Sequence, residues 1–311
     1  SATRGSIYNR QNWAAPSHQT ARSGSITWSA KYDIDNYRGR LTAANGDFTI
    51  STARNIVFHD AVTTAKSVDI FAQTGSFTHT LNWTAPSVMT ATAGDIRIRA
   101  LYDVHHYRST FTAAGNFSVA DARNIYFYDA ATKARNVAIN AERGSFTHMM
   151  HWATGSVMTA TAGSVSINAL YDVHHNRSRI SASGDVRIDD ARTVNFQDSD
   201  TTGRNIVINA NRGAFYHAMT WARGASTVAT GNLTIRAAGD VSNYRSTMSA
   251  DADLNILRSN NTYLYNSKTV ADGNLAITAT GTIVNRAYWT ATPAVLNGNS
   301  VALTAGGQIY N

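Results

Sequence analysis

Apolar and polar residues alternate along most of this chain in short runs. Examples are Gly94-Asp-Ile-Arg-Ile-Arg-Ala, Gly231-Asn-Leu-Thr-Ile-Arg-Ala and Gly273-Asn-Leu-Ala-Ile-Thr-Ala. Alternation with a period of two, bounded by Gly, Asn and Asp, indicates short β-strands that are separated by tight turns. Because no long stretch shows the apolar period of a helix, the pattern predicts an all-β protein.

The alternating runs belong to a long repeat. The sequence Asp103-Val-His-His returns as Asp172-Val-His-His about 69 residues later. Gly75, Gly144 and Gly213 each open a segment of Gly, a small residue and Phe, and they are separated by the same interval. A period this regular indicates a repeat architecture.

A shorter period lies within this long one. One position in the second apolar run of each segment recurs in steps of about 27, 22 and 21 residues and then of about 27, 21 and 21. We call this position the landmark column; it comprises Asn9, Asn36, Phe58, His79, His106, Phe127, His148, His175, Phe196, His217, Asn243, Leu264, Asn285 and Asn311. The spacing predicts about 14 coils of about 21 residues, with an insertion of about six residues in every third coil. Three coils form one superrepeat.

Short strands that recur once per coil cannot bury an apolar face alone. Stacking each coil on the next pairs equivalent strands in parallel and buries a continuous core. The sequence therefore predicts a right-handed parallel β-helix, that is a β-solenoid, because parallel β connections are right-handed. Since the repeat extends from end to end, we expect residues 1–311 to form a single domain.

Two columns of side chains support the stacking. The position two residues after the landmark carries Arg in the first coil of a superrepeat, Asp in the second and Leu or Met in the third. We expect Arg and Asp of adjacent coils to face one another and to fix the register, because a slip by one coil sets Arg against Met. This register ladder comprises Arg38, Asp60, Arg108, Asp129, Arg177 and Asp198.

The second column lies four residues before the landmark. There Tyr32, Tyr102 and Tyr171 precede an arginine of the next coil, which offers a cation–π contact; the arginines are Arg54, Arg123 and Arg192. The landmark column itself should face inward, because it shares strand parity with apolar residues such as Val104 and Val173.

Composition narrows the possible functions. The 311 residues include no cysteine, which rules out disulfides and thiolate metal sites. No apolar run reaches the length that a membrane-spanning helix needs, so no membrane span is predicted. The net charge of +7 arises from basic residues that are spread along the coils, which favours weak attraction to acidic glycans or anionic surfaces over nucleic-acid binding. The chain starts without Met, which we interpret as a processed or excised piece.

The coil pattern resembles a known family. Gly231-Asn-Leu-Thr-Ile-Arg-Ala-Ala-Gly-Asp-Val-Ser-Asn and Gly273-Asn-Leu-Ala-Ile-Thr-Ala-Thr-Gly-Thr-Ile-Val-Asn are similar to the filamentous haemagglutinin repeat of exoproteins that bacteria export by two-partner secretion. The resemblance covers essentially the whole chain. It implies a secreted, extracellular or cell-surface protein with an adhesive or scaffolding role. The secretion domain of that family and a toxin tip are not recognisable, and His, Tyr and Trp are denser than in such repeats.

The insertion carries the most distinctive candidate site. Five of the six tryptophans fall in it, one in each superrepeat: Trp13, Trp83, Trp152, Trp221 and Trp289. They form either a contact ridge for lateral or self-assembly, or a row of stacking platforms for glycans, or covers that fold back over their own corners.

Histidine pairs such as His105-His106 suggest a metal site. Adjacent residues on a strand point to opposite faces, so a pair cannot chelate one ion. Asn36 and Asn243 fill the same landmark position, which favours histidines that join a hydrogen-bonded ladder. We therefore predict neither a metal nor a cofactor. Acids are few and repeat in ladder positions instead of clustering, so no enzyme activity is expected.

Both termini stop at the same strand of a coil. Ile7-Tyr8-Asn9 matches Ile309-Tyr310-Asn311, and neither end carries a capping helix or a charged run. Unpaired strand edges invite pairing, which predicts end-to-end contacts between copies through these residues. The function we expect is a structural rod or filament with an adhesive role, and the alternative is a receptor- or glycan-binding stalk from a large adhesin or contact-dependent inhibition exoprotein.

Overall fold

The computed structural model describes residues 1–10, 16–81, 85–152, 155–221, 223–287 and 293–311. Every regular element among them is a β-strand, and all strand pairs are parallel. Each coil contributes one strand to each of three sheets, except the last, which contributes only β40. Sheet 1 carries the landmark column, sheet 2 follows it in the coil, and sheet 3 comes last. The predicted all-β parallel solenoid is confirmed.

The chain divides into two compact units. The N-terminal unit comprises Ser1–Thr147 and His151–Thr161, and the C-terminal unit comprises His148–Met150 and Ala162–Asn311. Strand β19 (Phe146–Met149) is divided between them. Whether residues 1–311 behave as a single domain stays a prediction.

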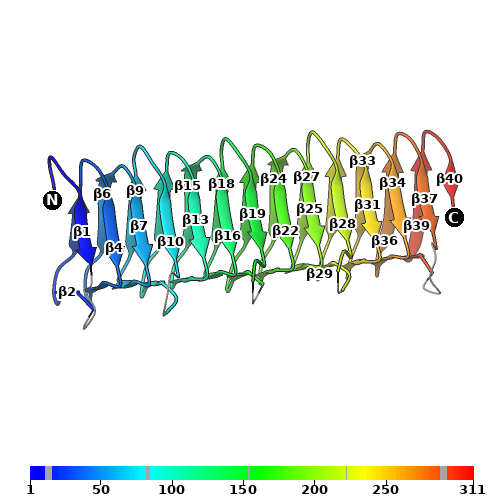
Figure 1. The fold of residues 1–311 in the computed structure, drawn as a ribbon. Helices are drawn as coiled ribbons and strands as arrows, with labels where there is room; N and C mark the ends of the chain where they lie inside the picture. Colours follow the sequence, from blue (N-terminus) through cyan, green and yellow to red (C-terminus); the bar gives the residue numbers. More distant parts are fainter. Residues whose placement is uncertain (11–15, 82–84, 153–154, 222, 288–292) are drawn as a thin grey trace. The chain divides into compact units, whose positions relative to one another are not determined.

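In the N-terminal unit each strand neighbours its equivalent in the next coil (Figure 1). Sheet 1 runs through β1 (Ile7–Arg10), β4 (Ile34–Tyr37), β7 (Ile56–His59), β10 (Phe77–Thr80), β13 (Val104–Tyr107) and β16 (Ile125–Tyr128). Sheet 2 runs through β2 (His18–Ala21), β5 (Arg40–Ala43), β8 (Val62–Ala65), β11 (Val88–Ala91), β14 (Thr110–Ala113), β17 (Ala131–Ala134) and β20 (Val157–Ala160). Sheet 3 runs through β3 (Ile26–Ser29), β6 (Phe48–Ala53), β9 (Val68–Ala72), β12 (Ile96–Ala100), β15 (Phe117–Ala122) and β18 (Val137–Ala141).

The C-terminal unit repeats the same design (Figure 1). Its sheet 1 runs through β22 (Val173–Asn176), β25 (Val194–Gln197), β28 (Phe215–Ala218), β31 (Val241–Tyr244), β34 (Thr262–Tyr265), β37 (Ile283–Arg286) and β40 (Ile309–Tyr310). Its sheet 2 runs through β23 (Arg179–Ala182), β26 (Asp200–Gly203), β29 (Ser226–Ala229), β32 (Thr247–Ala250), β35 (Lys268–Ala271) and β38 (Val295–Asn297). Its sheet 3 runs through β21 (Val165–Ala169), β24 (Val186–Ala191), β27 (Ile206–Ala210), β30 (Leu233–Ala237), β33 (Leu254–Ser259), β36 (Asn274–Ala279) and β39 (Ser300–Ala305).

The strand register follows the predicted spacing. Phe77 pairs with Val104 across the longer step, and Val104 pairs with Ile125 across the shorter one. Apolar side chains at alternate positions, such as Ile96 and Ile98, are fully buried. Except for the terminal Asn311, which is exposed, the landmark column faces inward as predicted: Asn36, Phe58, His79 and His106 are at most 1% exposed. The core therefore lies inside the coils.

The corner between sheets 1 and 2 takes two forms. In most coils two residues make it, such as Arg38-Gly39 between β4 and β5, and the first adopts a left-handed conformation, with φ 56° for Arg38. In every third coil a longer segment takes its place, such as residues 81–87 between β10 and β11. The strands on either side of this longer segment, β10 and β11, stay in register with their neighbours.

Candidate functional sites at the coil corners

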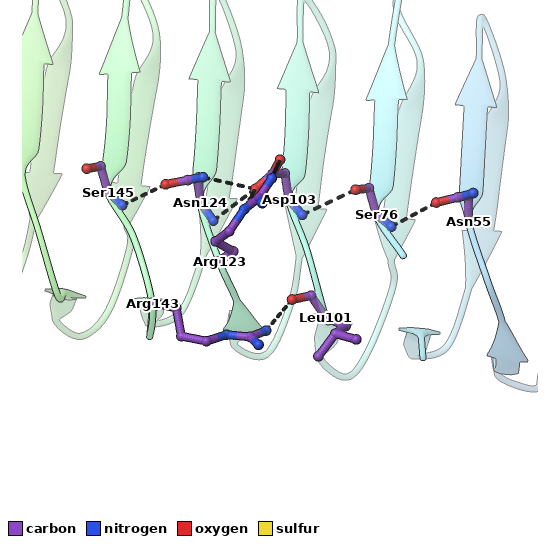
Figure 2. A network of polar contacts seen from close by, with 8 residues as sticks. All are labelled: Asn55, Ser76, Leu101, Asp103, Arg123, Asn124, Arg143 and Ser145. Carbon is purple, nitrogen blue, oxygen red and sulfur yellow. Dashed lines mark hydrogen bonds and ion pairs between the residues drawn. The ribbon is translucent and has the colours of Figure 1, made fainter. Parts of the chain in front are cut away.

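The corner between sheets 3 and 1 carries a polar cluster that recurs along the chain. In the N-terminal unit, Asp103 directly precedes β13, and Arg123-Asn124 is the corner of the next coil. Arg123 donates two hydrogen bonds to the Asp103 carboxylate, from Nε at 3.0 Å and from Nη2 at 2.7 Å. The amide of Asn124 adds a third from Nδ2 at 3.1 Å (Figure 2). This fork geometry gives a specific contact between adjacent coils.

The cluster continues as a ladder of hydrogen bonds along the corners (Figure 2). The backbone N–H of Ser145 donates to Asn124 Oδ1 at 3.0 Å, and that of Asn124 donates to Asp103 Oδ1 at 3.2 Å. The N–H of Asp103 donates to Ser76 Oγ, and that of Ser76 donates to Asn55 Oδ1. Side-chain oxygens thus satisfy the corner amides, which lie between strands and would otherwise lack partners.

The same arrangement occurs elsewhere. In the N-terminal unit Asp33 accepts from Arg54 and from Asn55, and the bond from Arg54 lowers the pKa of Asp33 against the opposing effect of burial. In the C-terminal unit Arg192 binds Asp172 in the same way. In the same unit, Asp185, Arg204 and Asn205 make an equivalent cluster at the corner between sheets 2 and 3. The ladder is therefore a general device of this fold.

The predicted cation–π contacts are confirmed. The guanidinium carbons lie 5.5, 5.3 and 5.5 Å from the ring centres of Tyr32, Tyr102 and Tyr171, in the pairs formed with Arg54, Arg123 and Arg192. Each arginine therefore contacts a tyrosine and an aspartate that are adjacent in sequence, as in Tyr102-Asp103. The tyrosine partner is predictable from the sequence pattern, whereas the aspartate was not predicted.

Another arginine of the same corner reaches further. The Nη2 of Arg143 donates to the carbonyl oxygens of Leu101 and Asp121, and Figure 2 shows its side chain extended toward Leu101. Arg212 does the same in the C-terminal unit, with Leu170 and Asp190. Each of these arginines therefore ties its own coil to the two coils before it.

The residues of the register ladder align as expected, but the described residues Arg108 and Arg177 do not form the expected ion pairs. Tyr107 pairs with Tyr128, so the residues that follow them, Arg108 and Asp129, occupy the same corner position, with φ 47° and 48°. No ion pair joins Arg108 to Asp129, or Arg177 to Asp198, among the residues that the structure describes.

Two aspartates of this ladder instead bind backbone amides at the insertion. Both carboxylate oxygens of Asp129 accept backbone amides, those of His151 and Trp152, each at 2.8 Å. Asp198 accepts the amides of Thr220 and Trp221. The corner column therefore anchors the insertion of the following coil, and its effect on register stays a prediction.

The tryptophans of the contact ridge fall into two groups. Trp13, Trp83 and Trp289 lie outside the described residues. Trp152 is 74% exposed and Trp221 is 82% exposed, so neither folds back over its corner. Their role as contact points stays a prediction.

Trp152 ends an aromatic cluster that the sequence analysis missed. His105 stacks on Tyr126 at 4.9 Å, and Tyr126 stacks on Tyr128 at 5.9 Å between ring centres. Tyr128 packs against His151, which stacks on Trp152 at 5.2 Å. The sequence pattern could have revealed this cluster, because Tyr126 and Tyr128 share strand parity and His105 occupies the position of Tyr126 in the preceding coil.

The landmark histidines form buried pairs. The Nδ1 atoms of His79 and His106 lie 3.5 Å apart, and those of His148 and His175 lie 3.0 Å apart. Burial lowers the pKa of His79 well below its ordinary value, and it lowers the pKa of His106 to about 3 and that of His175 to about 4. His79, His106 and His175 are therefore neutral at physiological pH.

Asparagine makes the equivalent ladder contact in other coils. Asn9 Nδ2 donates to Asn36 Oδ1 at 2.8 Å, and His217 Nδ1 lies 2.8 Å from Asn243 Oδ1. The interpretation of the histidines as ladder residues agrees with this geometry. Among the described residues no group of three His, Cys, Asp or Glu side chains is placed to hold a metal ion. No helix in that part of the chain has the length and apolarity to cross a membrane.

Three parallel sheets with repeating corner ladders define the class of β-solenoid repeat proteins. The model of the haemagglutinin repeat matches residues 11–121, 153–216 and 221–311, which is most of the chain. The chain therefore belongs to the haemagglutinin repeat family, as the sequence resemblance predicted. Comparisons with curated proteins and with solved structures give no match. Proteins built from this repeat are typically secreted or cell-surface exoproteins, and the fold is a structural one of the adhesin type.

Proposed function

We propose that this chain is the rod of a secreted or surface-bound bacterial exoprotein with an adhesive role. The observation that carries the proposal is the corner ladder, in which Asp103, Arg123 and Asn124 join adjacent coils and leave the corner amides satisfied. A stack held together coil by coil suits a scaffold that presents contact residues at regular intervals.

The exposed tryptophans are the proposed contact points. Trp152 and Trp221 project from equivalent insertions, whose amides Asp129 and Asp198 fix. Aromatic residues are enriched at interfaces and stack on sugar rings, so either a cell-surface glycan or a protein surface fits them.

Adhesion can be tested with the purified chain on immobilised bacterial and epithelial cells. We expect saturable binding that falls severalfold in the double variant Trp152→Ser/Trp221→Ser. Val301→Ser is the matched control, because Val301 is also exposed, at 45%, but lies on sheet 3. Equal binding by the parent and the double variant would exclude the tryptophans, and absence of binding by the parent would exclude adhesion.

End-to-end association of chains is a second candidate function. Strand β1 pairs only with β4, and β40 pairs only with β37, among the strand pairs of the described residues. Asn9 and Asn311 each end a column of paired asparagines, with Asn36 and with Asn285. A second copy would extend both the backbone pairing and the asparagine column.

Negative-stain electron microscopy across a concentration series tests this association. We expect filaments that lengthen with concentration, and short particles in the variant Tyr8→Pro, because proline removes an amide and its ring disturbs strand pairing. Tyr8 is 61% exposed, so the substitution leaves the core intact. Particles of constant length at all concentrations would contradict the proposal.

A further inference from the structure

The C-terminal unit contains a cleft at the corner between sheets 1 and 2 that is lined by two cationic side chains. It measures about 340 Å³ and lies beside Arg245, Lys268 and Val295. Arg245 occupies the left-handed corner position with φ 50°, and Lys268 pairs with Val295 across sheet 2. Register thus places both cations on one opening.

Neither cation is neutralised in the described part of the chain. Arg245 and Lys268 are exposed and take part in none of its ion pairs, and none of the described residues lining the cleft is acidic. Two cations without a counter-charge favour an anionic ligand.

A buried hydroxyl group adds an independent observation. Ser267 lines the cleft, is 2% exposed, and its Oγ has no hydrogen-bond partner among the described residues. Buried polar atoms nearly always have a partner, so this hydroxyl can donate to a group that enters the cleft.

The N-terminal unit provides an internal comparison. A cleft of about 390 Å³ lies at the same kind of corner, beside Arg108, Asp129 and Ala131. There the tripeptide Asp129-Ala130-Ala131 replaces Asn266-Ser267-Lys268, and Asp129 already binds two backbone amides. The same backbone corner therefore carries balanced charge in one unit and net positive charge in the other.

We propose that the C-terminal cleft binds a small acidic molecule through its carboxylate or sulfate group. Arg245 and Lys268 would receive the anion, and the Ser267 hydroxyl would donate to it. Pro293 and Val295 supply an apolar flank, which fits the carbon face of a sugar. The volume lies at the lower end of small-molecule sites, which suits a ligand of monosaccharide size. This inference does not depend on the adhesive role.

Isothermal titration calorimetry with four probes tests the site: glucuronate, glucose 6-sulfate, glucose and inorganic sulfate. We expect both acidic sugars to bind with one site per chain, glucose not to bind, and inorganic sulfate to bind more weakly than the sugars. Raising the salt concentration should weaken binding because the contacts are ionic.

The chain's own tripeptides supply the variants. The triple variant Asn266→Asp/Ser267→Ala/Lys268→Ala reproduces the N-terminal corner and should weaken acidic-sugar binding at least about tenfold. The reverse change, Ala130→Ser/Ala131→Lys, should create a second, weaker site. Circular dichroism checks that each variant folds. Equal affinity in the parent and the triple variant, or equal binding of glucose and glucuronate, would overturn the proposal; sulfate binding as tightly as the sugars would overturn the sugar-sized ligand.

Discussion

At the scale of single residues, side-chain oxygens at the corners set the sequence requirements. The Asn124 Oδ1 that accepts the Ser145 amide occupies the space where a side chain of residue 144 would begin. A Cβ on Gly144 would lie 2.1 Å from that oxygen and 2.4 Å from the Arg123 carbonyl oxygen. The recurrent glycine that reveals the superrepeat period is therefore required by the ladder and not by its own φ, which is not positive.

Replacing Gly144 with alanine should therefore destabilise the protein. We expect a loss of about 1–3 kcal/mol, as for overpacking in a rigid site, measured as a shift in the midpoint of chemical denaturation. Gly24→Ala is the matched control, because its Cβ would meet nothing within 4 Å. That variant should be neutral or slightly stabilised, since alanine lowers the entropy of the unfolded chain. Equal effects of the two substitutions would show that the ladder does not constrain Gly144.

Asp129 and Arg108 provide a second test at this scale. Asp129→Ala should free the amides of His151 and Trp152, and their hydrogen exchange should accelerate at least about tenfold. Arg108→Ala should leave both exchange rates unchanged, because Arg108 is not paired with Asp129 in the described structure. If Arg108→Ala accelerated exchange as strongly as Asp129→Ala, an ionic register contact would be supported after all.

At the scale of the strand, sheet 1 places neutral histidine side chains in the core. His79, His106, His175 and His217 are at most 1% exposed, and burial lowers the pKa of His217 to about 4. The unfolded chain takes up protons on these residues near pH 6.5, before the folded chain does. The contribution of these histidines to the free energy of unfolding is therefore fully present above about pH 6.5. It is lost as the pH falls toward the folded-state pKa values.

This linkage predicts acid-sensitive unfolding between pH 6.5 and 4.5. Each histidine should reduce the free energy of unfolding by about 1.4 kcal/mol per pH unit in that range, measured from denaturation midpoints at several pH values. His79→Asn/His106→Asn recreates the Asn9–Asn36 pair and should flatten the pH dependence by two histidines. The variant should also be less stable at pH 7, since both rings stack on Phe111. An unchanged slope would contradict the assignment.

Strand patterns were readable from the sequence, whereas corner geometry was not. The inward landmark column and the Tyr102–Arg123 contact follow from parity and coil spacing alone. The Asp103–Arg123 pairing depends on where the backbone turns, and the left-handed conformation of Arg108 and Asp129 at their corner is not visible in the alternation of apolar and polar residues. The sequence shows Asn266 and Lys268 where the N-terminal unit has Asp129 and Ala131. That these residues line a cleft is known only from the structure.

At the scale of the whole molecule, the same contacts between adjacent coils recur once in each three-coil superrepeat. Asp33 and Asp103 stand one superrepeat apart, and each meets an Arg-Asn corner in the next coil, Arg54-Asn55 or Arg123-Asn124. In a stack where each coil contacts its neighbours, stability is a sum of such interfaces. Matching interfaces should therefore matter more than chain length.

Two deletions within the N-terminal unit separate these quantities. Removing residues 37–106 joins Asn36 to Tyr107, so that Asp33 meets Arg123 and Asn124 in place of Arg54 and Asn55. Removing residues 107–127 joins His106 to Tyr128, so that Asp103 faces Gly144-Ser145 and loses its arginine fork. We expect the larger deletion to unfold at the higher temperature in circular dichroism, because it preserves every type of interface. If the shorter deletion were the more stable, the number of coils would govern stability, and the superrepeat would be a sequence pattern without an energetic role.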